Sequence, residues 1–259
     1  STNVIFTFDA NPGATRTGTL TIAGQTLTVT QAGSTFVTAG SVTTLVGSGL
    51  NSPTSVAVDG AGNVYLADRN NSAIKKWNKA TNTTNSLVST GLALPNAVAV
   101  DGAGNVYIAD SGNNAIKKWT ATNALVITLV SNGLTNPTGV AVDLAGNVYI
   151  ADRNNSAIKK WSVTDSNVIT LVNSGLNNPI AVAVDVTGNV YIADTFNGAI
   201  KKWHAADSNV VTLISSGLST PAGIAVDGAG NVYIANSAAH NIRKWTAATG
   251  LVTTIASSG

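Results

Sequence analysis

Short apolar runs alternate with polar segments along most of the chain, and this pattern repeats every 42 residues. In the copy that begins at Pro137, the apolar and β-branched runs are 139–143, 148–152, 157–161 and 168–172. These runs have the length and residue types of β-strands, and the Gly and Asn residues between them suit tight turns. No capping box precedes an apolar pattern of helical period. The sequence therefore predicts four short antiparallel strands per repeat and an all-β fold.

Aromatic residues and prolines mark each copy of the repeat. The same 42-residue spacing separates the following sets: Trp77, Trp119, Trp161, Trp203 and Trp245; Tyr65, Tyr107, Tyr149, Tyr191 and Tyr233; Pro53, Pro95, Pro137, Pro179 and Pro221. A fixed period of this size indicates stacked copies of one unit that cannot bury its apolar face alone. Four short strands in about 40 residues are typical of a β-propeller blade. We expect the Trp and Tyr series to pack between blades.

The sequence of each copy resembles the NHL repeat, as in GNVYIADSGNNAIKKW at residues 104–119. That family's pattern is a Pro-led inner strand ending in Asp, then Gly-Asn-Val-Tyr-Val-Ala-Asp, then a strand ending in an aromatic residue. The resemblance covers about residues 41–259. It implies a propeller, commonly of six blades. The matching positions are structural ones, so the resemblance implies a fold and no activity.

The number of blades depends on the first 46 residues. Residues 47–259 hold five 42-residue blades, whereas an orphan fourth strand at 42–46 and apolar runs at 4–8, 17–22 and 25–30 precede them. We predict that residues 1–46 form a degenerate first blade that closes a six-bladed ring. The alternative is five blades plus an N-terminal hairpin, because residues 16–33 resemble the C-terminal half of a BACON-type domain. That family occurs in bacterial surface and secreted proteins.

Composition narrows the classes of function. Charged residues make up only 10% of the chain, the net charge is +2, and Glu, Cys and Met are absent. Without Cys there are no disulfides, thiolate metal sites or Cys nucleophiles, which fits a secreted protein. No apolar run approaches the roughly 18–20 residues of a membrane span. We expect a monomer or part of a larger multidomain chain, an expectation that the start at Ser1 without Met also fits.

The carboxylates occupy repeated positions. Asp59 and its equivalents precede Gly-containing first turns, and Asp68 and its equivalents end the second strands, with Asn236 in the fifth copy. Calcium binding would suit such oxygens, but we predict that they cap turns and hold strands. General acid–base catalysis needs two carboxylates in different environments. His204 and His240 lie in non-equivalent loops, so we predict no enzyme, no catalytic residue, no metal and no cofactor.

Lysine pairs account for most of the positive charge: Lys75–Lys76, Lys117–Lys118, Lys159–Lys160, Lys201–Lys202 and Arg243–Lys244. We predict that their stems cover apolar surface and that one cation of each pair contacts Trp. A basic belt for nucleic acid or acidic glycans is the alternative. Charge spaced evenly around a ring differs from the one-sided patch that nucleic acid needs, so we consider nucleic acid an unlikely partner.

Differences between copies indicate where a ligand binds. The second turn and the approach to the inner strand vary most, and both lie on the same face in a four-stranded meander; the loop between the third and fourth strands also varies, on the other face. The binding candidates are Arg69, Asn96, Arg153, Phe196 and His240. Phe196 is the only Phe inside the repeats. An exposed loop aromatic suits contact with a partner.

The predicted function is a non-catalytic extracellular propeller that binds protein or glycan, or acts as a scaffold, through one face. We expect it in a secreted or cell-surface bacterial protein. One alternative is an enzyme that resembles propeller lyases or lactonases, with a metal at the channel mouth. The other is binding of nucleic acid or acidic glycans through the Lys pairs.

Overall fold

The chain divides into two compact units, Ser1–Thr44 and Leu45–Gly259. The computed structural model describes residues 16–22, 25–31 and 44–257. In the first unit, β1 (Arg16–Ile22) and β2 (Gln25–Gln31) pair antiparallel as a two-stranded sheet. The strands predicted at 17–22 and 25–30 are therefore confirmed, and they pair with each other.

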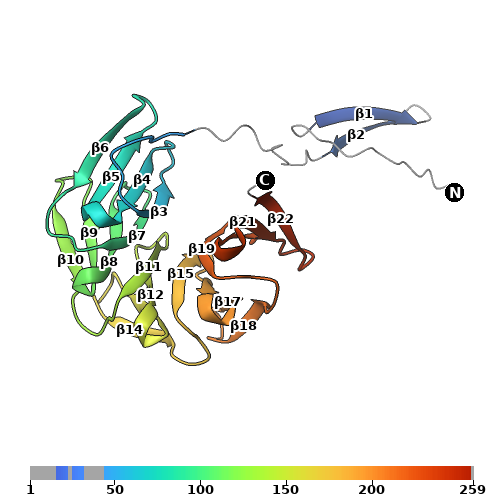
Figure 1. Cartoon of the computed structure of the whole chain (residues 1–259). Coiled ribbons are helices and arrows are strands. Elements are labelled where there is room, and N and C mark those ends of the chain that lie inside the picture. The colour runs from blue at the N-terminus through green and yellow to red at the C-terminus, as the bar shows by residue number, and fades with distance from the viewer. Residues whose placement is uncertain (1–15, 23–24, 32–43, 258–259) are drawn as a thin grey trace. The chain divides into compact units, whose positions relative to one another are not determined.

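The second unit consists of five four-stranded antiparallel sheets, here called blades 1 to 5 (Figure 1). Each blade is a meander whose strands follow chain order from the channel outwards. The blades are β3 (Pro53–Val58), β4 (Val64–Asp68), β5 (Ala73–Asn78) and β6 (Thr83–Val88); β7 (Pro95–Val100), β8 (Val106–Asp110), β9 (Ala115–Trp119) and β10 (Val126–Val130); β11 (Pro137–Val142), β12 (Val148–Asp152), β13 (Ala157–Trp161) and β14 (Val168–Val172); β15 (Pro179–Val184), β16 (Val190–Asp194), β17 (Ala199–Trp203) and β18 (Val210–Ile214); β19 (Pro221–Val226), β20 (Val232–Asn236), β21 (Asn241–Trp245) and β22 (Val252–Ser257).

Each second turn contains one turn of 3₁₀ helix that the sequence pattern did not predict. These are η1 (Arg69–Asn71), η2 (Ser111–Asn113), η3 (Arg153–Asn155), η4 (Thr195–Asn197) and η5 (Ser237–Ala239). The residue after each adopts a left-handed conformation, with φ of 58° at Gly198 and 50° at His240. None of the helices in the described part of the chain could cross a membrane.

Packing between neighbouring blades forms the core. Tyr65 and Ile74 of blade 1 pack with Val98, Val106 and Ile108 of blade 2, and equivalent clusters join the later blades. Burying one such aliphatic side chain stabilises the fold by about 1.5–3 kcal/mol. The prediction that the Tyr and Trp series pack between blades is confirmed, since Tyr107 and Trp161 share one buried cluster.

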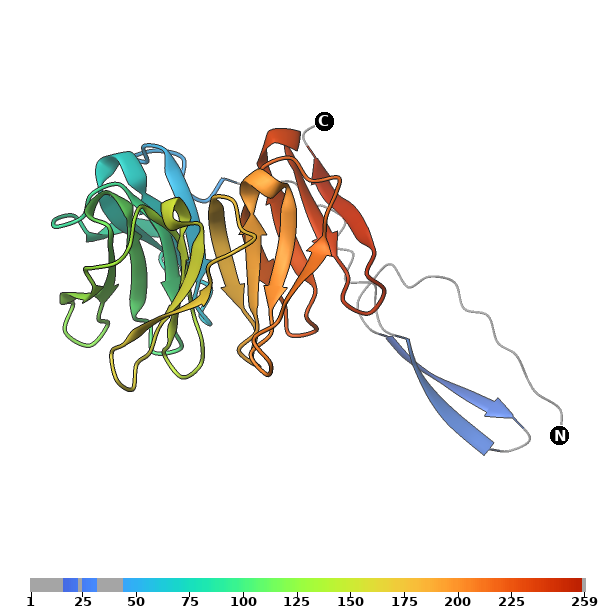
Figure 2. The same ribbon diagram turned by 90° about the horizontal axis from the view of Figure 1, so that it is seen from below.

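The inner strands surround a channel but do not close around it. Consecutive inner strands pack side by side from β3 through β7, β11 and β15 to β19, whereas β19 makes no comparable contact with β3. The five blades therefore form an open arc (Figure 1). Strands in all blades run between two opposite faces, where the connecting loops gather (Figure 2).

The described residues contain five blades, so the alternative of five blades with an N-terminal hairpin is the one found and the six-bladed arrangement is corrected. Residues 44–46, the described part of the orphan strand expected at 42–46, lie outside any strand. β1 and β2 satisfy each other's backbone groups in a hairpin of their own. The strand expected at 4–8 lies outside the described residues.

Candidate functional site

The blades present two faces with different chemistry. We call upper the face that carries the second turns and the segments leading into the inner strands, and lower the face that carries the first turns. Hydrogen bonds tie the two upper elements together: the Asn70 N–H donates to the Asn51 carbonyl, and the Gly112 N–H to the Ala93 carbonyl. The two most variable connections therefore lie on one face, as the meander predicts.

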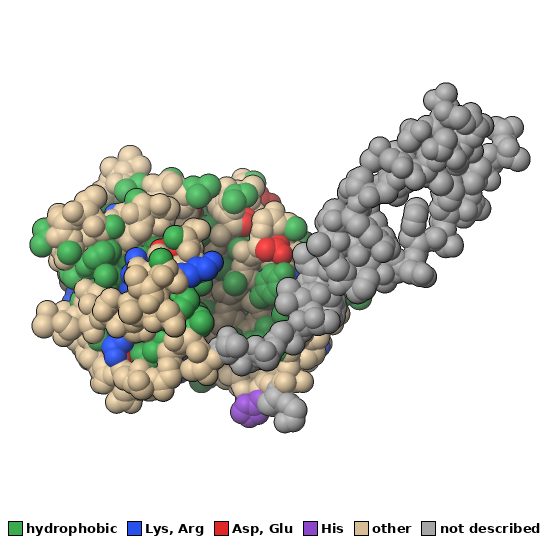
Figure 3. Space-filling model, turned by 90° about the horizontal axis from the view of Figure 1, so that it is seen from above, with side chains coloured by type: hydrophobic (Ala, Val, Ile, Leu, Met, Phe, Trp, Pro, Cys, Tyr) green, Lys and Arg blue, Asp and Glu red, His purple; other side chains and the backbone are tan. Residues whose placement is uncertain are grey.

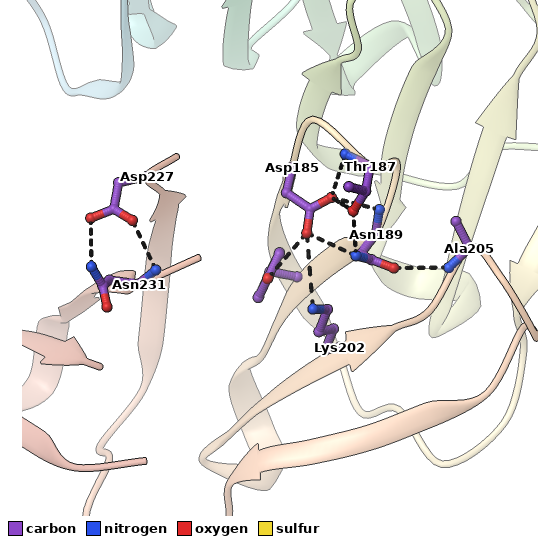
Figure 4. Close-up of polar contacts among 8 residues, drawn as sticks. Asp185, Thr187, Asn189, Lys202, Ala205, Asp227 and Asn231 are labelled. Atoms are coloured by element: carbon purple, nitrogen blue, oxygen red, sulfur yellow. Dashed lines mark hydrogen bonds and ion pairs between the residues drawn. The ribbon is translucent and has the colours of Figure 1, made fainter. Parts of the chain in front are cut away.

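On the lower face the first-turn aspartates cap their own turns (Figure 4). The Asp185 Oδ1 accepts the N–H groups of Thr187 and Asn189, each at 3.0 Å. Its Oδ2 accepts the Asn189 Nδ2 at 2.9 Å and the Tyr191 hydroxyl at 3.2 Å. The Lys202 Nζ lies 3.9 Å from the same oxygen. The carboxylate therefore accepts hydrogen bonds from its own turn, as the sequence predicted.

Hydrogen bonding keeps these carboxylates charged. Burial raises the pKa of Asp101, Asp185 and Asp227, but hydrogen bonds to the charged form outweigh it and the pKa of each lies below the ordinary value of 3.8. The bonds that Asp227 receives from Asn231 illustrate the common arrangement (Figure 4). A carboxyl group that holds its charge in this way is poorly suited to donate a proton in catalysis near neutral pH.

These shifts predict that the propeller loses stability in acid. Because the folded pKa values lie below the unfolded ones, the unfolded chain binds more protons, and stability falls as pH drops through the window below about 3.8. We expect the thermal midpoint to fall between about pH 5 and pH 2. Asp227→Asn, which removes one titrating group, is expected to weaken this dependence. A midpoint that stays constant over the range contradicts the prediction.

The upper aspartates anchor the second turn to the preceding loop. Asp110 is 0% exposed and accepts three bonds of 2.7 Å, from the Lys117 Nζ, the Asn113 Nδ2 and the Ala93 N–H. Lys117 also donates to the Gly91 carbonyl. The group is a structural anchor, as predicted for the residue that ends the second strand.

In blade 5 the neutral amide of Asn236 stands in place of this carboxylate. The Asn236 Oδ1 accepts the Ser219 N–H at 2.5 Å, and the Arg243 Nη1 donates to the Gly217 carbonyl at 2.5 Å. Asn thus preserves the hydrogen bond to the loop without the charge. Arg243 has no carboxylate within ion-pair distance among the described residues.

The second lysine of each pair lies over Tyr and not over Trp, which corrects the predicted contact. The ammonium nitrogens lie 4.9–5.4 Å from the Tyr ring centroids. The register explains the choice, because Lys76 pairs directly with Tyr65 across β4 and β5, whereas Trp77 pairs with Val64. In blades 1 to 4 the first lysine binds Asp and the second covers Tyr, which argues against a free basic belt.

Two binding candidates meet across a blade boundary on the upper face. The Arg153 guanidinium carbon lies 6.0 Å from the centroid of the Phe196 ring, within the range of a cation–π contact. The Arg153 Nε donates to the Asn178 Oδ1 at 3.2 Å. Phe196 is 59% exposed. The pair therefore presents an aromatic face and a partly anchored guanidinium to solvent.

The other candidates lie on other blades. Arg69 is half-buried and its Nη1 lies 3.4 Å from the Asn70 Oδ1. Asn96 lines the channel mouth, where its carbonyl accepts the Thr54 hydroxyl at 2.9 Å. His240 is exposed after η5. No hydrogen bond or ion pair between described residues joins these three to the Arg153–Phe196 pair.

The first residue of each second turn differs in its hydrogen bonding, a difference that the sequence does not show. The Ser111 hydroxyl donates to the Pro137 carbonyl of the next blade at 2.5 Å, and the Thr195 hydroxyl to the Pro221 carbonyl at 2.8 Å. Arg153 stands at the same position of its turn and makes no such bond. At this position a bond from Arg153 to the Asn178 Oδ1 replaces the hydroxyl-to-carbonyl bond, and the guanidinium lies beside Phe196.

The channel is lined mainly by small and aliphatic side chains around a hollow of about 420 Å³. Its hydroxyl groups are used between blades: the Thr138 Oγ1 donates to the Ile180 carbonyl at 3.0 Å. Within the described ranges, no three His, Cys, Asp or Glu side chains converge in a way that could hold a metal ion. The residues that line the hollow include no Asp, Glu, His or Cys.

The repeat family decides the classification. The NHL repeat family matches residues 50–77, 92–119 and 134–161, which lie in blades 1 to 3 of a fold already seen to be a propeller. The chain is a β-propeller whose first three blades carry NHL repeats. No curated protein matches this NHL propeller.

Solved structures resemble the NHL propeller in fold. A chain of the nidogen/laminin complex has a TM-score of 0.71 and 20% identity, over 78% of this chain and 79% of that chain. Virginiamycin B lyase from Staphylococcus aureus has a TM-score of 0.64 and 16% identity, over 78% and 69%. A streptogramin B lyase has a TM-score of 0.66 and 14% identity, over 78% and 67%. At these identities the likeness shows the fold alone.

Proposed function

We propose that this NHL propeller is a non-catalytic binding module that contacts a partner protein through its upper face, at the boundary of blades 3 and 4. The observation that carries the proposal is the Arg153–Phe196 pair. Arg and aromatic residues dominate the binding energy of protein interfaces, where they cluster in small groups. A glycan is the alternative partner.

The geometry of the pair suits recognition of a carboxylate beside an apolar group. Asn178 holds the Arg153 Nε, and the ring of Phe196 restrains the guanidinium plane, so little side-chain freedom remains to be lost on binding. A guanidinium fork binds a carboxylate with two parallel hydrogen bonds. The exposed ring supplies apolar area next to it.

The surface is also asymmetric, as a specific site requires. The second turns of the other blades carry Asn70, Gly112, Asn154 and Ala238 where blade 4 carries Phe196. Among the second turns of the five described blades, those at the boundary of blades 3 and 4 alone combine Arg with an aromatic residue. The absence of Cys and the BACON-like segment support, as part of the proposal, a secreted or cell-surface bacterial protein.

The proposal predicts that Arg153→Ala and Phe196→Ala each weaken binding at least tenfold, as loss of a hot-spot residue does. The probes are a displayed library of random peptides and a glycan array, both tested on the full chain. Peptides enriched on the wild type are then measured against each variant by biolayer interferometry.

Matched controls lie on the lower face. Val186→Ala removes an exposed apolar side chain from the first turn of blade 4, and Lys79→Ala removes an exposed cation. Both are expected to leave binding unchanged. The proposal is wrong if enriched peptides bind the Arg153 and Phe196 variants as tightly as the wild type. Binding of glycans alone would replace the protein partner with a carbohydrate.

A further inference from the structure

The two ends of the arc expose apolar positions that every interior blade buries. In blade 1, Val56 is 63% exposed, whereas the equivalent Val98, Val140 and Val182 are 5–6% exposed. Val58, the next residue on the same strand to be strongly exposed, is 59% exposed. This face of blade 1 therefore lacks the neighbour that covers it in blades 2, 3 and 4.

Blade 5 exposes the opposite half of the same interface. Ile242 is 37% exposed, whereas Ile74, Ile116, Ile158 and Ile200 at the same position are 0% exposed. Tyr233 is also only half-buried, unlike its four equivalents. We call the space between the Val56–Val58 wall and the Tyr233–Ile242 wall the seam.

The two walls of the seam carry the two sides of the contact that joins neighbouring blades. Within the arc, Tyr65 and Ile74 of blade 1 pack on Val98 of blade 2, and this contact recurs at each boundary between consecutive blades. The Tyr233–Ile242 wall is the first half of such a contact and the Val56 wall is the second. Both Val56 and Ile242 line one hollow that continues into the channel.

The molecular surface is hollowed and partly hydrophobic at the seam. The space-filling view is hollowed between two masses of the propeller, and hydrophobic side chains lie on both sides of the hollow (Figure 3). Basic and acidic side chains also lie at its edges (Figure 3). An apolar recess with two facing walls is a site for association and not an ordinary scattering of surface hydrophobics.

We propose that the seam binds one four-stranded β-sheet supplied by another chain, apolar on both faces in the pattern of this repeat. Continuity with the four interfaces inside the arc identifies the occupant, because a sheet in the seam must meet a Tyr–Ile wall on one side and a Val wall on the other. A blade inside a second propeller already has a neighbour on at least one face. The occupant is therefore a sheet whose two faces are both free.

A peptide of one repeat of this chain provides the probe. Residues 134–175 contain the whole of blade 3, whose Val140 and Ile158 present the two apolar faces. Titrated into the full chain and followed by isothermal calorimetry, the peptide is expected to bind saturably with one peptide per propeller. Hydrogen exchange in β3 and β21 is expected to slow when it binds.

Variants of the walls test the location. Val56→Asp and Ile242→Asp place a charge in the seam and are expected to weaken peptide binding at least tenfold. Since both positions are already exposed, these variants are expected to fold, which circular dichroism checks. The matched control is Leu144→Asp, because Leu144 is 91% exposed in a first turn and lies outside the seam walls. It is expected to bind the peptide like the wild type.

Four results overturn the proposal. The peptide fails to bind and leaves exchange in β3 and β21 unchanged, or the wall variants bind it as tightly as the wild type. Sedimentation shows that a second copy of the full chain occupies the seam, with the Val56 and Ile242 variants remaining monomeric. Peptide binding requires removal of residues 1–43, which would assign the seam to the chain's own first segment.

Discussion

Replacement of Asp110 by Ala is expected to lower the free energy of unfolding by about 3–5 kcal/mol, the cost of breaking a buried ion pair from one side. The carboxylate is 0% exposed and accepts bonds from Lys117, Asn113 and the Ala93 N–H. Its removal leaves a largely buried ammonium and a backbone donor without their acceptor. Urea denaturation followed by circular dichroism measures the loss.

Blade 5 supplies a matched control for this substitution. Asn236 occupies the equivalent position and keeps the hydrogen bond to the Ser219 N–H. Asp110→Asn is therefore expected to cost about 1–3 kcal/mol, less than Asp110→Ala, because one buried donor keeps its acceptor. If both variants unfold within about 0.5 kcal/mol of the wild type, which is the range of ordinary surface substitutions, the aspartate is not an anchor.

Ile158→Ala is expected to destabilise the propeller by about 2–5 kcal/mol, whereas Ile242→Ala is expected to cost less than about 1 kcal/mol. The two residues hold the same position in the repeat, but Ile158 is 0% exposed and Ile242 is 37% exposed. The first substitution opens a cavity between blades 3 and 4, while the second shortens a side chain that already meets solvent. Urea denaturation of the two variants, in parallel with the wild type, provides the comparison.

This pair of variants tests the open arc independently of any ligand. Equal losses would mean that the wall of blade 5 is covered in solution as fully as the interior walls are. A large loss at Ile158 alone would confirm that the last blade ends without a neighbour.

Most of the blade could be predicted because its cues are local. Alternating apolar residues, Gly-containing first turns and the prolines that start the inner strands give the strands nearly residue for residue, as at Val148–Asp152 and Ala157–Trp161. The 3₁₀ turns escaped prediction because three residues are too few to show a period. The contact of Lys76 with Tyr65 needed the strand register, which the sequence does not state.

The number of blades could not be predicted in the same way. It depends on whether residues far apart in sequence, at the two ends of the array, meet, and no local pattern reports such a contact. Five four-stranded sheets lie between Pro53 and Ser257. The expectation that strands before residue 46 add a blade assumed that β-rich segments join the nearest open sheet. In the described residues β1 and β2 pair with each other instead.

The candidate site was likewise predicted in part, in its residues but not in their contact. Arg153 and Phe196 were both selected by comparing turns between copies, but their contact across the boundary of blades 3 and 4 was not foreseen. Positions one repeat apart in the second turn lie next to each other on the upper face, so a residue and the one 43 positions later become neighbours. The 42-residue period alone implies that such positions lie close together.

An open arc also tolerates a change in the number of repeats better than a closed ring does. In a closed ring the number of blades fixes the angle at every boundary, so the gain or loss of one repeat disturbs all of them. In an array whose blades contact only their neighbours, a terminal repeat can be duplicated or deleted at the cost of a single interface. β19 makes no contact with β3 comparable to those between neighbouring inner strands, so each terminal blade described here shares an extensive interface with a single neighbouring blade.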